Sequence, residues 1–364
     1  MIARTLEEME RYGSSPERIP PPPPGRSGWP WERASSTGPI VADAKWPRIT
    51  IVIPSYNQGR FIEETIRSVL LQDYPDLELI VFDGGSTDES VEVIRKYEQH
   101  LAYWASEADR GQTHAINKGL ERATGEIFSY LNSDDLLMPD ALFRVAEGFA
   151  ERREADVLYG GCVYMDEAGT ELFTTWGRVT DFVSYLRIWE RLARREFLTQ
   201  PEVFCRTEAL VEAGGFREEL RSVMDLEMWL RLLARGRRFE MLEAPIAKYR
   251  LYAGQKSSVD PGDELCSVVQ EYVLSTPEVS TTEKGRILEE LEHARAHFLI
   301  GAALAANMLD RYPDAIRYSL RAAASSPRIV AGYEFWAVLA NPLKKLVRPK
   351  YRRAIQNFMR AGGA

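Results

Sequence analysis

Strand-like and helix-like segments alternate along the chain from Arg48 to about Tyr164. The run from Ile49 to Ile53 is short, apolar and β-branched, which predicts a buried strand that Pro54 ends. Further strands are expected at residues 77–82, 101–105 and 126–131, with apolar residues at helical spacing between them. This alternation predicts an α/β fold with a mostly parallel sheet and helices on both faces.

The pattern changes in the second half of the chain. Leu226 and Trp229 belong to an amphipathic helix, which Gly236 is expected to end. Residues 283–326 predict two antiparallel helices with alanine-rich faces, joined near Pro313. We therefore expect a C-terminal helical extension after the α/β domain.

Two flanking segments differ from the rest. Residues 1–46 form an arm in which five consecutive prolines, beginning at Pro20, favour polyproline II and exclude a sheet. Trp29 and Trp31 follow, and they predict packing of the arm onto the domain, with a docking site for a partner as the alternative. The expected division is an arm at 1–46, an α/β domain at 47–258, a hairpin at 259–333 and a tail at 334–364.

The tail at 334–364 carries seven Lys or Arg residues and one acid, interleaved with aromatic and aliphatic residues. This mixture suits peripheral contact with an anionic membrane surface, and the alternative is a helix packed on the domain. Pro342 and Pro349 divide the tail into short pieces, which weakens the membrane interpretation.

The composition sets limits on partners and location. A net charge of −8 argues against nucleic acid as a partner. The three cysteines are far apart and fit no disulfide framework or zinc spacing, so a reducing compartment is expected. We expect no signal peptide and no membrane helix, which indicates the cytoplasm, with the tail at the inner face of the cell membrane.

Acidic residues fall where the expected strands end. Asp83 directly follows the second strand, and Asp134 and Asp135 follow the fourth. Parallel α/β sheets bind ligands at this edge, and adjacent acids in an extended segment point to opposite sides. One of the pair can hold a ribose while the other binds a hard divalent cation.

The alternative for these acids is local. Asp83 and Asp88 can serve a turn and a helix cap, and Asp134 and Asp135 can serve a turn. Ser86 with Glu89 also predicts a capping box that begins a helix ending near Tyr97. The coincidence of acids at matching strand ends favours a binding site.

At these positions the chain resembles a known family. The matching motifs are Ile51-Val52-Ile53-Pro54-Ser55-Tyr56-Asn57, Asp83-Gly84-Gly85-Ser86-Thr87-Asp88, Asn117-Lys118-Gly119, Asn132-Ser133-Asp134-Asp135, Gln200-Pro201, Gly214-Gly215-Phe216 and Asp225-Leu226-Glu227-Met228-Trp229. In order and spacing they are similar to the signatures of family-two glycosyltransferases with the GT-A fold, over residues 48–258. The resemblance implies a GT-A domain that uses a nucleotide-sugar donor.

The resemblance also implies roles on the donor side. Pro54, Tyr56 and Asp83 would hold the nucleotide base, with Asp83 accepting a hydrogen bond from a uracil-like imide. Asn117 and Lys118 would lie near the phosphates or the ribose of the donor.

It further implies the metal and the catalytic groups. Asp134 would face the ribose, and Asp135 would bind Mg²⁺ or Mn²⁺, which offsets charge on the diphosphate leaving group. Asp225 would be the general base, and Gln200 and Trp229 would lie near the acceptor.

Two positions depart from the family pattern. His114 stands where relatives often have an acid, and Tyr252 stands where many have a histidine, so contacts from these positions are in doubt. Arg250, Lys256 and Ser257 are candidates for binding the diphosphate, with plain surface roles as the alternative. Near Asp225, the acid Glu227 is expected to form a surface ion pair with Arg231, four residues further along the helix.

The resemblance implies an inverting transfer of a sugar from a nucleotide-diphosphate sugar, UDP-linked, to a hydroxyl acceptor. The acceptor would be a saccharide or lipid-linked, in polysaccharide or glycolipid synthesis. The alternatives are a metal-dependent nucleotidyltransferase and a non-catalytic scaffold that binds nucleotide-sugars.

Overall fold

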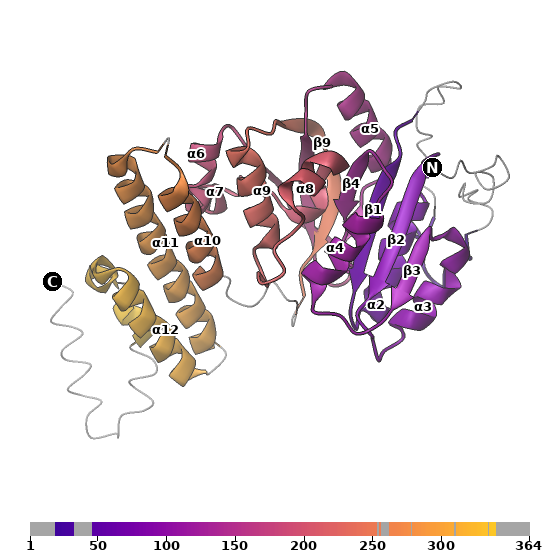
Figure 1. The fold of residues 1–364 in the computed structure, drawn as a ribbon. Coiled ribbons are helices and arrows are strands. Elements are labelled where there is room, and N and C mark those ends of the chain that lie inside the picture. Colours follow the sequence, from indigo (N-terminus) through magenta and orange to yellow (C-terminus); the bar gives the residue numbers. More distant parts are fainter. Residues whose placement is uncertain are drawn as a thin grey trace. The chain divides into compact units, whose positions relative to one another are not determined.

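The computed structural model describes residues 19–32, 46–252, 255, 262–277, 279–308, 311–333 and 335–339. Residue contacts divide the chain into two compact units, Met1–Ser258 and Val259–Ala364. The first unit contains the sheet, and the second contains the C-terminal helices (Figure 1). The finer predicted division into arm, domain, hairpin and tail stays a prediction.

In the described residues, nine strands form one mixed sheet. They are β1 (Ile49–Ser55), β2 (Leu77–Asp83), β3 (Tyr103–Ser106), β4 (Ile127–Tyr130), β5 (Leu136–Leu137), β6 (Val157–Met165), β7 (Glu171–Trp176), β8 (Val203–Arg206) and β9 (Phe239–Arg250). Their order is β3-β2-β1-β4-β8-β6-β9-β5, and β7 pairs with β6. The first four strands are parallel, as are β6 and β9, whereas β5, β7 and β8 run antiparallel to their neighbours. The predicted mostly parallel α/β fold is confirmed.

Helices of the first unit connect these strands. They are α2 (Gly59–Leu70), α3 (Ser90–Lys96), η2 (Glu98–His100), α4 (Gln112–Arg122), α5 (Ala141–Glu151), α6 (Phe182–Tyr185), α7 (Ile188–Arg194), η3 (Gln200–Glu202), α8 (Thr207–Ala213) and α9 (Met224–Ala234). Gly236 follows α9 with a φ of 73°, where its missing Cβ permits a left-handed helix end, as predicted.

Helices cover both faces of the sheet because successive side chains of a strand point to opposite sides. Ile51 and Ile53 of β1 lie in the core cluster that contains residues of α2, α3 and α5. Val52 faces the other way, toward α4. A Cβ at Gly119 of α4 would lie 2.5 Å from a methyl carbon of Val52, so glycine permits this close packing.

Two local predictions are wrong. Pro54 does not end β1, which continues to Ser55 with Pro54 opposite Phe82. The predicted capping box is also absent, because α3 begins only at Ser90. Asp88, just before the helix, instead accepts the Ser90 backbone N–H through Oδ1 at 3.0 Å.

Residues 19–32, here called the strap, pack against α2. Arg67 of α2 is 3% exposed and donates to the carbonyls of Pro20, Pro30 and Trp31 at 2.6, 3.1 and 2.8 Å. Trp31 is buried, and the indole N–H of Trp29 donates to the carbonyl of Leu137 at 2.9 Å. In this part of the arm the tryptophans pack onto the domain.

The second unit contains α10 (Gly262–Ser275), α11 (Thr281–Met308), α12 (Tyr312–Ser325) and η5 (Pro327–Ala331). The short connection between α11 and α12 makes them a helical hairpin (Figure 1). Ala303, Ala315 and Ala322 are fully buried in one cluster, where small side chains let the helices pack closely. The predicted hairpin is present, whereas α10 had no counterpart in the sequence analysis.

The beginning of the tail belongs to the same cluster. Phe335 and Val338 are buried in it, and Asn307 Nδ2 donates to the Val338 carbonyl at 2.6 Å. The basic residues from Lys344 to Arg360 lie outside the described residues, so the membrane contact stays a prediction. No helix in the described part of the chain is long and apolar enough to cross a membrane.

Candidate active site

The turn after β4 holds two buried carboxylates. Asp135 is 0% exposed, and its two carboxylate oxygens accept the Arg250 backbone N–H at 2.9 Å and Asn132 Nδ2 at 3.3 Å. Burial, followed by the charge of Asp134, raises the pKa of Asp135 well above its ordinary value. Asp135 is therefore fully buried, and each of its oxygens accepts one donor from its surroundings.

Asp134 lies beside it and faces the ends of two other strands. Its Oδ2 accepts the hydroxyl of Tyr252 at 2.8 Å, and that hydroxyl accepts Gln58 Nε2 at 2.9 Å. Oδ1 accepts no hydrogen bond from any other described residue. Residues that follow β1, β4 and β9 thus meet at one phenol.

Two pKa shifts describe this contact. Burial raises the pKa of Asp134, and the hydrogen bond from Tyr252 opposes the shift. Burial, and then the Asp134 charge, raise the pKa of Tyr252 to about 12, so the phenol is neutral and donates at physiological pH.

Asp83 organises the loop after β2. Its Oδ2 accepts the backbone N–H groups of Gly85 and Ser86 and the hydroxyl of Ser106, at 3.1, 2.9 and 2.6 Å. Its Oδ1 accepts the hydroxyl of Ser86 at 2.5 Å. A carboxylate oxygen has two lone-pair sites, so Oδ1 retains one for another donor. The contact with a base stays a prediction, beside the turn role that the structure shows.

The loops after β1 and β2 are joined. The Asn57 backbone N–H donates to Ser86 Oγ at 2.7 Å, and the Thr87 N–H donates to Asn57 Oδ1 at 2.9 Å. Tyr56, next to this junction, is 62% exposed, whereas Pro54 is buried inside the sheet. Tyr56 therefore presents an open aromatic ring beside the Asp83 loop.

Asn117 and Lys118 both have protein partners. The Asn117 side chain donates to the carbonyl of Phe216 and accepts its N–H, each at 2.8 Å. Lys118 Nζ donates to Glu107 at 2.9 Å and lies 4.6 Å from the ring centre of Phe82. Asn117 fixes the Phe216 backbone in this structure, and contact of either residue with the donor stays a prediction.

Asp225 lies in the first turn of α9, where its Oδ1 accepts the Leu226 N–H at 2.8 Å. Burial raises the pKa of Tyr130, and the charges of Asp225 and then Asp135 raise it further. Tyr130 ends β4 and packs edge-on against Phe216, with ring centres 5.5 Å apart. The two charges that add to this rise in the pKa of Tyr130 thus come from two elements, the first turn of α9 and the turn after β4.

The expected surface pair of Glu227 is buried instead. Glu227 is 1% exposed and accepts Arg231 at 2.7 Å, because α9 turns this side toward Arg217 and the loop before it. The pairing prediction is confirmed, and its predicted surface location is wrong.

The two residues expected near the acceptor are also buried. Gln200 Nε2 donates to the Tyr130 carbonyl, and its Oε1 has no partner among the described residues. Trp229 packs edge-on against Phe239, with ring centres 6.5 Å apart. Gln200 thus lies beside Tyr130 with an acceptor atom unused, whereas Trp229 packs in the core, and acceptor contacts of both stay predictions.

Arg250 does not present its charge to a ligand. It is 1% exposed, and its side chain donates to the carbonyls of Asp134 and Glu167, each at 2.9 Å, and to Glu64 at 2.5 Å. The expectation that it binds the diphosphate is wrong in this structure. Lys256 and Ser257 lie outside the described residues.

The described residues contain no group of three His, Cys, Asp or Glu side chains that could hold a metal ion. A divalent cation at this site would therefore rely on one or two carboxylates, with oxygens of a bound diphosphate completing its coordination, as is common for Mg²⁺. Asp134, whose Oδ1 accepts no donor from the other described residues, fits such a site.

Comparison with known proteins identifies the family. The sequence profile "Glycosyl transferase family 2" matches residues 50–218. TuaG of Bacillus subtilis, named for teichuronic acid biosynthesis, is 30% identical over 220 residues, which cover 58% of this chain and 82% of TuaG. The chain belongs to glycosyltransferase family 2. It spans only 37% to 41% of the length of three other relatives.

Solved structures support the GT-A fold of this family-2 glycosyltransferase. Residues 1–349 of S. aureus TarS, solved with UDP-GlcNAc, match with a TM-score of 0.57 at 20% identity, over 86% of this chain and 92% of that one. The mannosyltransferase PcManGT of Pyrobaculum calidifontis, solved with GDP-Man and Mn²⁺, matches with a TM-score of 0.50 at 20% identity, over 98% and 91%. The predicted GT-A fold and family are confirmed.

Some contacts of this glycosyltransferase had no signal in the sequence. Glu64, Thr65 and Ser106 belong to no quoted motif, yet each contacts a residue or segment of the site. His114 accepts the Arg110 N–H at 3.3 Å, a local contact within its own turn.

Proposed function

We propose that this glycosyltransferase moves a sugar from a UDP-sugar to a hydroxyl group of a cell-surface polysaccharide or its lipid-linked precursor, with inversion and with Mg²⁺ or Mn²⁺. One observation carries the proposal: the buried acids Asp134 and Asp135 follow β4 at the sheet edge where Asp83 ends β2, and a hydrogen-bonded chain through Tyr252 joins their turn to the segment after β1. Acids able to hold a nucleotide and a metal ion are thereby available at one edge of the parallel strands.

We further propose that Asp134 holds the metal and that Asp135 supports it. This reverses the order expected from the family motif, because Asp135 is 0% exposed with one N–H donor on each oxygen, whereas Asp134 is 8% exposed. Asp134 Oδ1 accepts none from the other described residues. A bound Mg²⁺ or Mn²⁺ would offset the charge that develops on the diphosphate.

The base of the donor would lie between Tyr56 and Asp83. An exposed aromatic ring can stack on a base, and Asp83 Oδ1 has a lone pair left for an imide N–H. The UDP-GlcNAc of TarS and the GDP-Man of PcManGT both agree with a nucleotide-sugar donor. Lys118 would have to exchange Glu107 for a phosphate to contact the donor.

In the transfer, the acceptor oxygen forms a bond to the anomeric carbon while the bond to the diphosphate oxygen breaks. The carboxylate of Asp225 takes the hydroxyl proton as that bond forms. Gln200 Oε1, buried without a donor among the described residues, would accept a hydrogen bond from the acceptor. The name of TuaG supports a polysaccharide as the acceptor.

Thermal stabilisation by ligands tests the donor class. We expect a UDP-sugar with Mn²⁺ to raise the melting temperature, since a ligand at about 100 times its Kd contributes about 2.7 kcal/mol. GDP- and ADP-sugars, and each UDP-sugar with EDTA, are the controls. Stabilisation by GDP-sugars alone would mean that the donor base is guanine. If no nucleotide-sugar stabilises the protein, the proposal is contradicted.

Tyr252 provides a test through pH. Tyr252→Phe removes a donor that favours charged Asp134, so the pKa of Asp134 should rise further. A proton would then compete with the metal up to a higher pH, and Mn²⁺-dependent affinity should develop at higher pH than in wild type. Calorimetric titrations of UDP with Mn²⁺ between about pH 5 and 8 measure this shift.

The matched control is Tyr164→Phe, whose hydroxyl contacts Thr199 instead of a carboxylate. It should leave the pH profile unchanged. Equal pH profiles for wild type and Tyr252→Phe would mean that protonation of Asp134 does not control metal binding.

A further inference from the structure

The turn that carries Asp134 and Asp135 continues into β5, and α2 contacts both segments. Thr65 Oγ1 donates to the Asp135 carbonyl at 2.8 Å. The Leu137 N–H donates to Ser68 Oγ at 3.1 Å. Thr65 and Ser68 are less than one helical turn apart, so one face of α2 holds the turn at two points.

Arg250 holds the same turn from β9. Its backbone N–H and its Nε donate to Asp135 Oδ1 and to the Asp134 carbonyl, while a third donor of the same residue contacts Glu64 of α2. A guanidinium is planar and presents its donors in fixed directions, so these contacts set the turn relative to α2. Lysine would keep the charge and lose this geometry.

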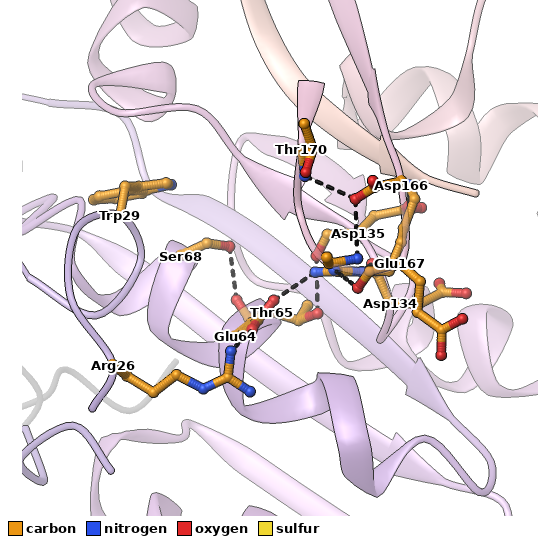
Figure 2. Close-up of polar contacts among 12 residues, drawn as sticks. Arg26, Trp29, Glu64, Thr65, Ser68, Asp134, Asp135, Asp166, Glu167 and Thr170 are labelled. Carbon is orange, nitrogen blue, oxygen red and sulfur yellow. Dashed lines mark hydrogen bonds and ion pairs between the residues drawn. The ribbon is translucent and has the colours of Figure 1, made fainter. Parts of the chain in front are cut away.

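The strap reaches the turn by two routes. Arg26 lies 3.5 Å from Glu64 Oε1, while the other oxygen of Glu64 accepts Arg250. Trp29 donates directly to the carbonyl of Leu137. Figure 2 shows Glu64 and Thr65 between Arg26 and the two aspartates. The strap is therefore connected to the turn both through α2 and by direct contact with β5.

We propose that Arg250, Glu64 and the strap form one positioning unit that fixes the carboxylates of Asp134 and Asp135. We assign all three a positioning role, which they exert through the turn. A displacement of about 1 Å at a reacting group can cost about 100-fold in rate, so the position of this turn matters for the reaction. Residues 19–32 are thereby a functional part of the transferase domain.

The effect on metal binding rests on the proposed function, whereas the order of the turn does not. We therefore measure both. Amide hydrogen exchange of peptides covering residues 131–138 reports the turn without any ligand. Calorimetry with UDP, with and without Mn²⁺, reports the metal-dependent affinity.

The decisive pair of variants is Glu64→Gln and Glu63→Gln. Glu63 is the neighbouring acid on α2, but it accepts Lys96 and Tyr97 at 2.6 and 2.7 Å and makes no contact with Arg250. Glu64→Gln should speed exchange of 131–138 and lower the Mn²⁺-dependent affinity about 10–100-fold, the usual cost of losing support behind a metal ligand. Glu63→Gln should do neither, even if its melting temperature falls as much.

Two milder variants test the two connections of the strap one at a time. They also keep the inference testable if Glu64→Gln folds poorly. Trp29→Phe keeps an aromatic ring and removes the indole N–H that donates to Leu137. Arg26→Gln removes the half-exposed guanidinium that pairs with Glu64 and lies over the Trp31 ring. Each should speed exchange of 131–138 to a smaller degree, while residues 203–206 of β8 exchange as in wild type.

Unchanged exchange at 131–138 in Glu64→Gln, or an equal change in Glu63→Gln, would overturn the inference. Faster exchange in a protein that binds no nucleotide would support the positioning unit and count against the proposed function alone. Faster exchange with unaltered Mn²⁺-dependent affinity would overturn the link from the turn to the metal.

Discussion

Replacing Asp225 by Asn is expected to lower kcat about 10²–10⁴-fold while donor affinity stays nearly unchanged. The amide keeps the shape of the side chain and loses the ability to take a proton. It also keeps an oxygen that can accept the Leu226 N–H, so α9 should begin as before. Initial rates with the cognate donor and acceptor, and calorimetry with the donor alone, measure the two quantities.

Glu227→Gln is the matched comparison, two residues along the same helix. Because Glu227 is buried against Arg231, this change should destabilise the fold, by about 3–5 kcal/mol if the arginine charge stays unpaired. Its folded fraction should turn over at a rate near wild type. A kcat loss confined to Glu227→Gln would move the base there, and near-normal turnover of Asp225→Asn would refute the assignment.

Asp134→Asn is expected to remove the gain in nucleotide affinity that Mn²⁺ provides, and to leave metal-free affinity in place. A neutral amide is a far weaker ligand for a hard cation than a carboxylate. Titrations of UDP with and without Mn²⁺ measure this gain for wild type and both aspartate variants.

Asp135→Asn should lower the Mn²⁺-dependent gain in nucleotide affinity less than Asp134→Asn does. It should also change how the stability of the fold depends on pH. Because the pKa of Asp135 is raised on folding, the metal-free fold loses stability relative to the unfolded chain as pH rises from the unfolded pKa toward the folded pKa. Below the pKa of the unfolded chain, about 3.9, the aspartate is protonated in both states and this difference vanishes. The melting temperature of Asp135→Asn relative to wild type should therefore rise as pH increases.

If Asp135→Asn abolished the Mn²⁺ effect and Asp134→Asn preserved it, the order expected from the family motif would be correct. That outcome would require Asp135 to release the Arg250 N–H or Asn132 when the metal binds.

The strand ends were predictable because the signals there are local. β-branched runs and the acids after them gave the positions of β1, β2 and β4, and Asp83, Asp134 and Asp135 follow from these. Even so, Pro54 did not end its strand, because β1 continues opposite Phe82.

Contacts between distant segments were not predictable. From the sequence, Arg250 is a candidate cation for a phosphate site. In the structure it pairs with Met165 in the sheet, and its side chain donates to the turn after β4 and so points inward. Asn117 bonds to Phe216, which is 99 residues away in the sequence, and Glu64 bonds to Arg250, which is 186 residues away. Periodicity in the sequence carries no information about such pairs.

Assay of the reaction is the most direct test of sugar transfer from a nucleotide-sugar with Asp225 as general base. The donor that stabilises the protein with Mn²⁺ is incubated with the enzyme, and released nucleoside diphosphate is measured, with pyrophosphate release from the matching nucleoside triphosphate measured in parallel. We expect diphosphate release that increases with acceptor and falls about 10²–10⁴-fold in Asp225→Asn, with no pyrophosphate release. Pyrophosphate release from the triphosphate, or diphosphate release that is unaffected by Asp225→Asn, would contradict it.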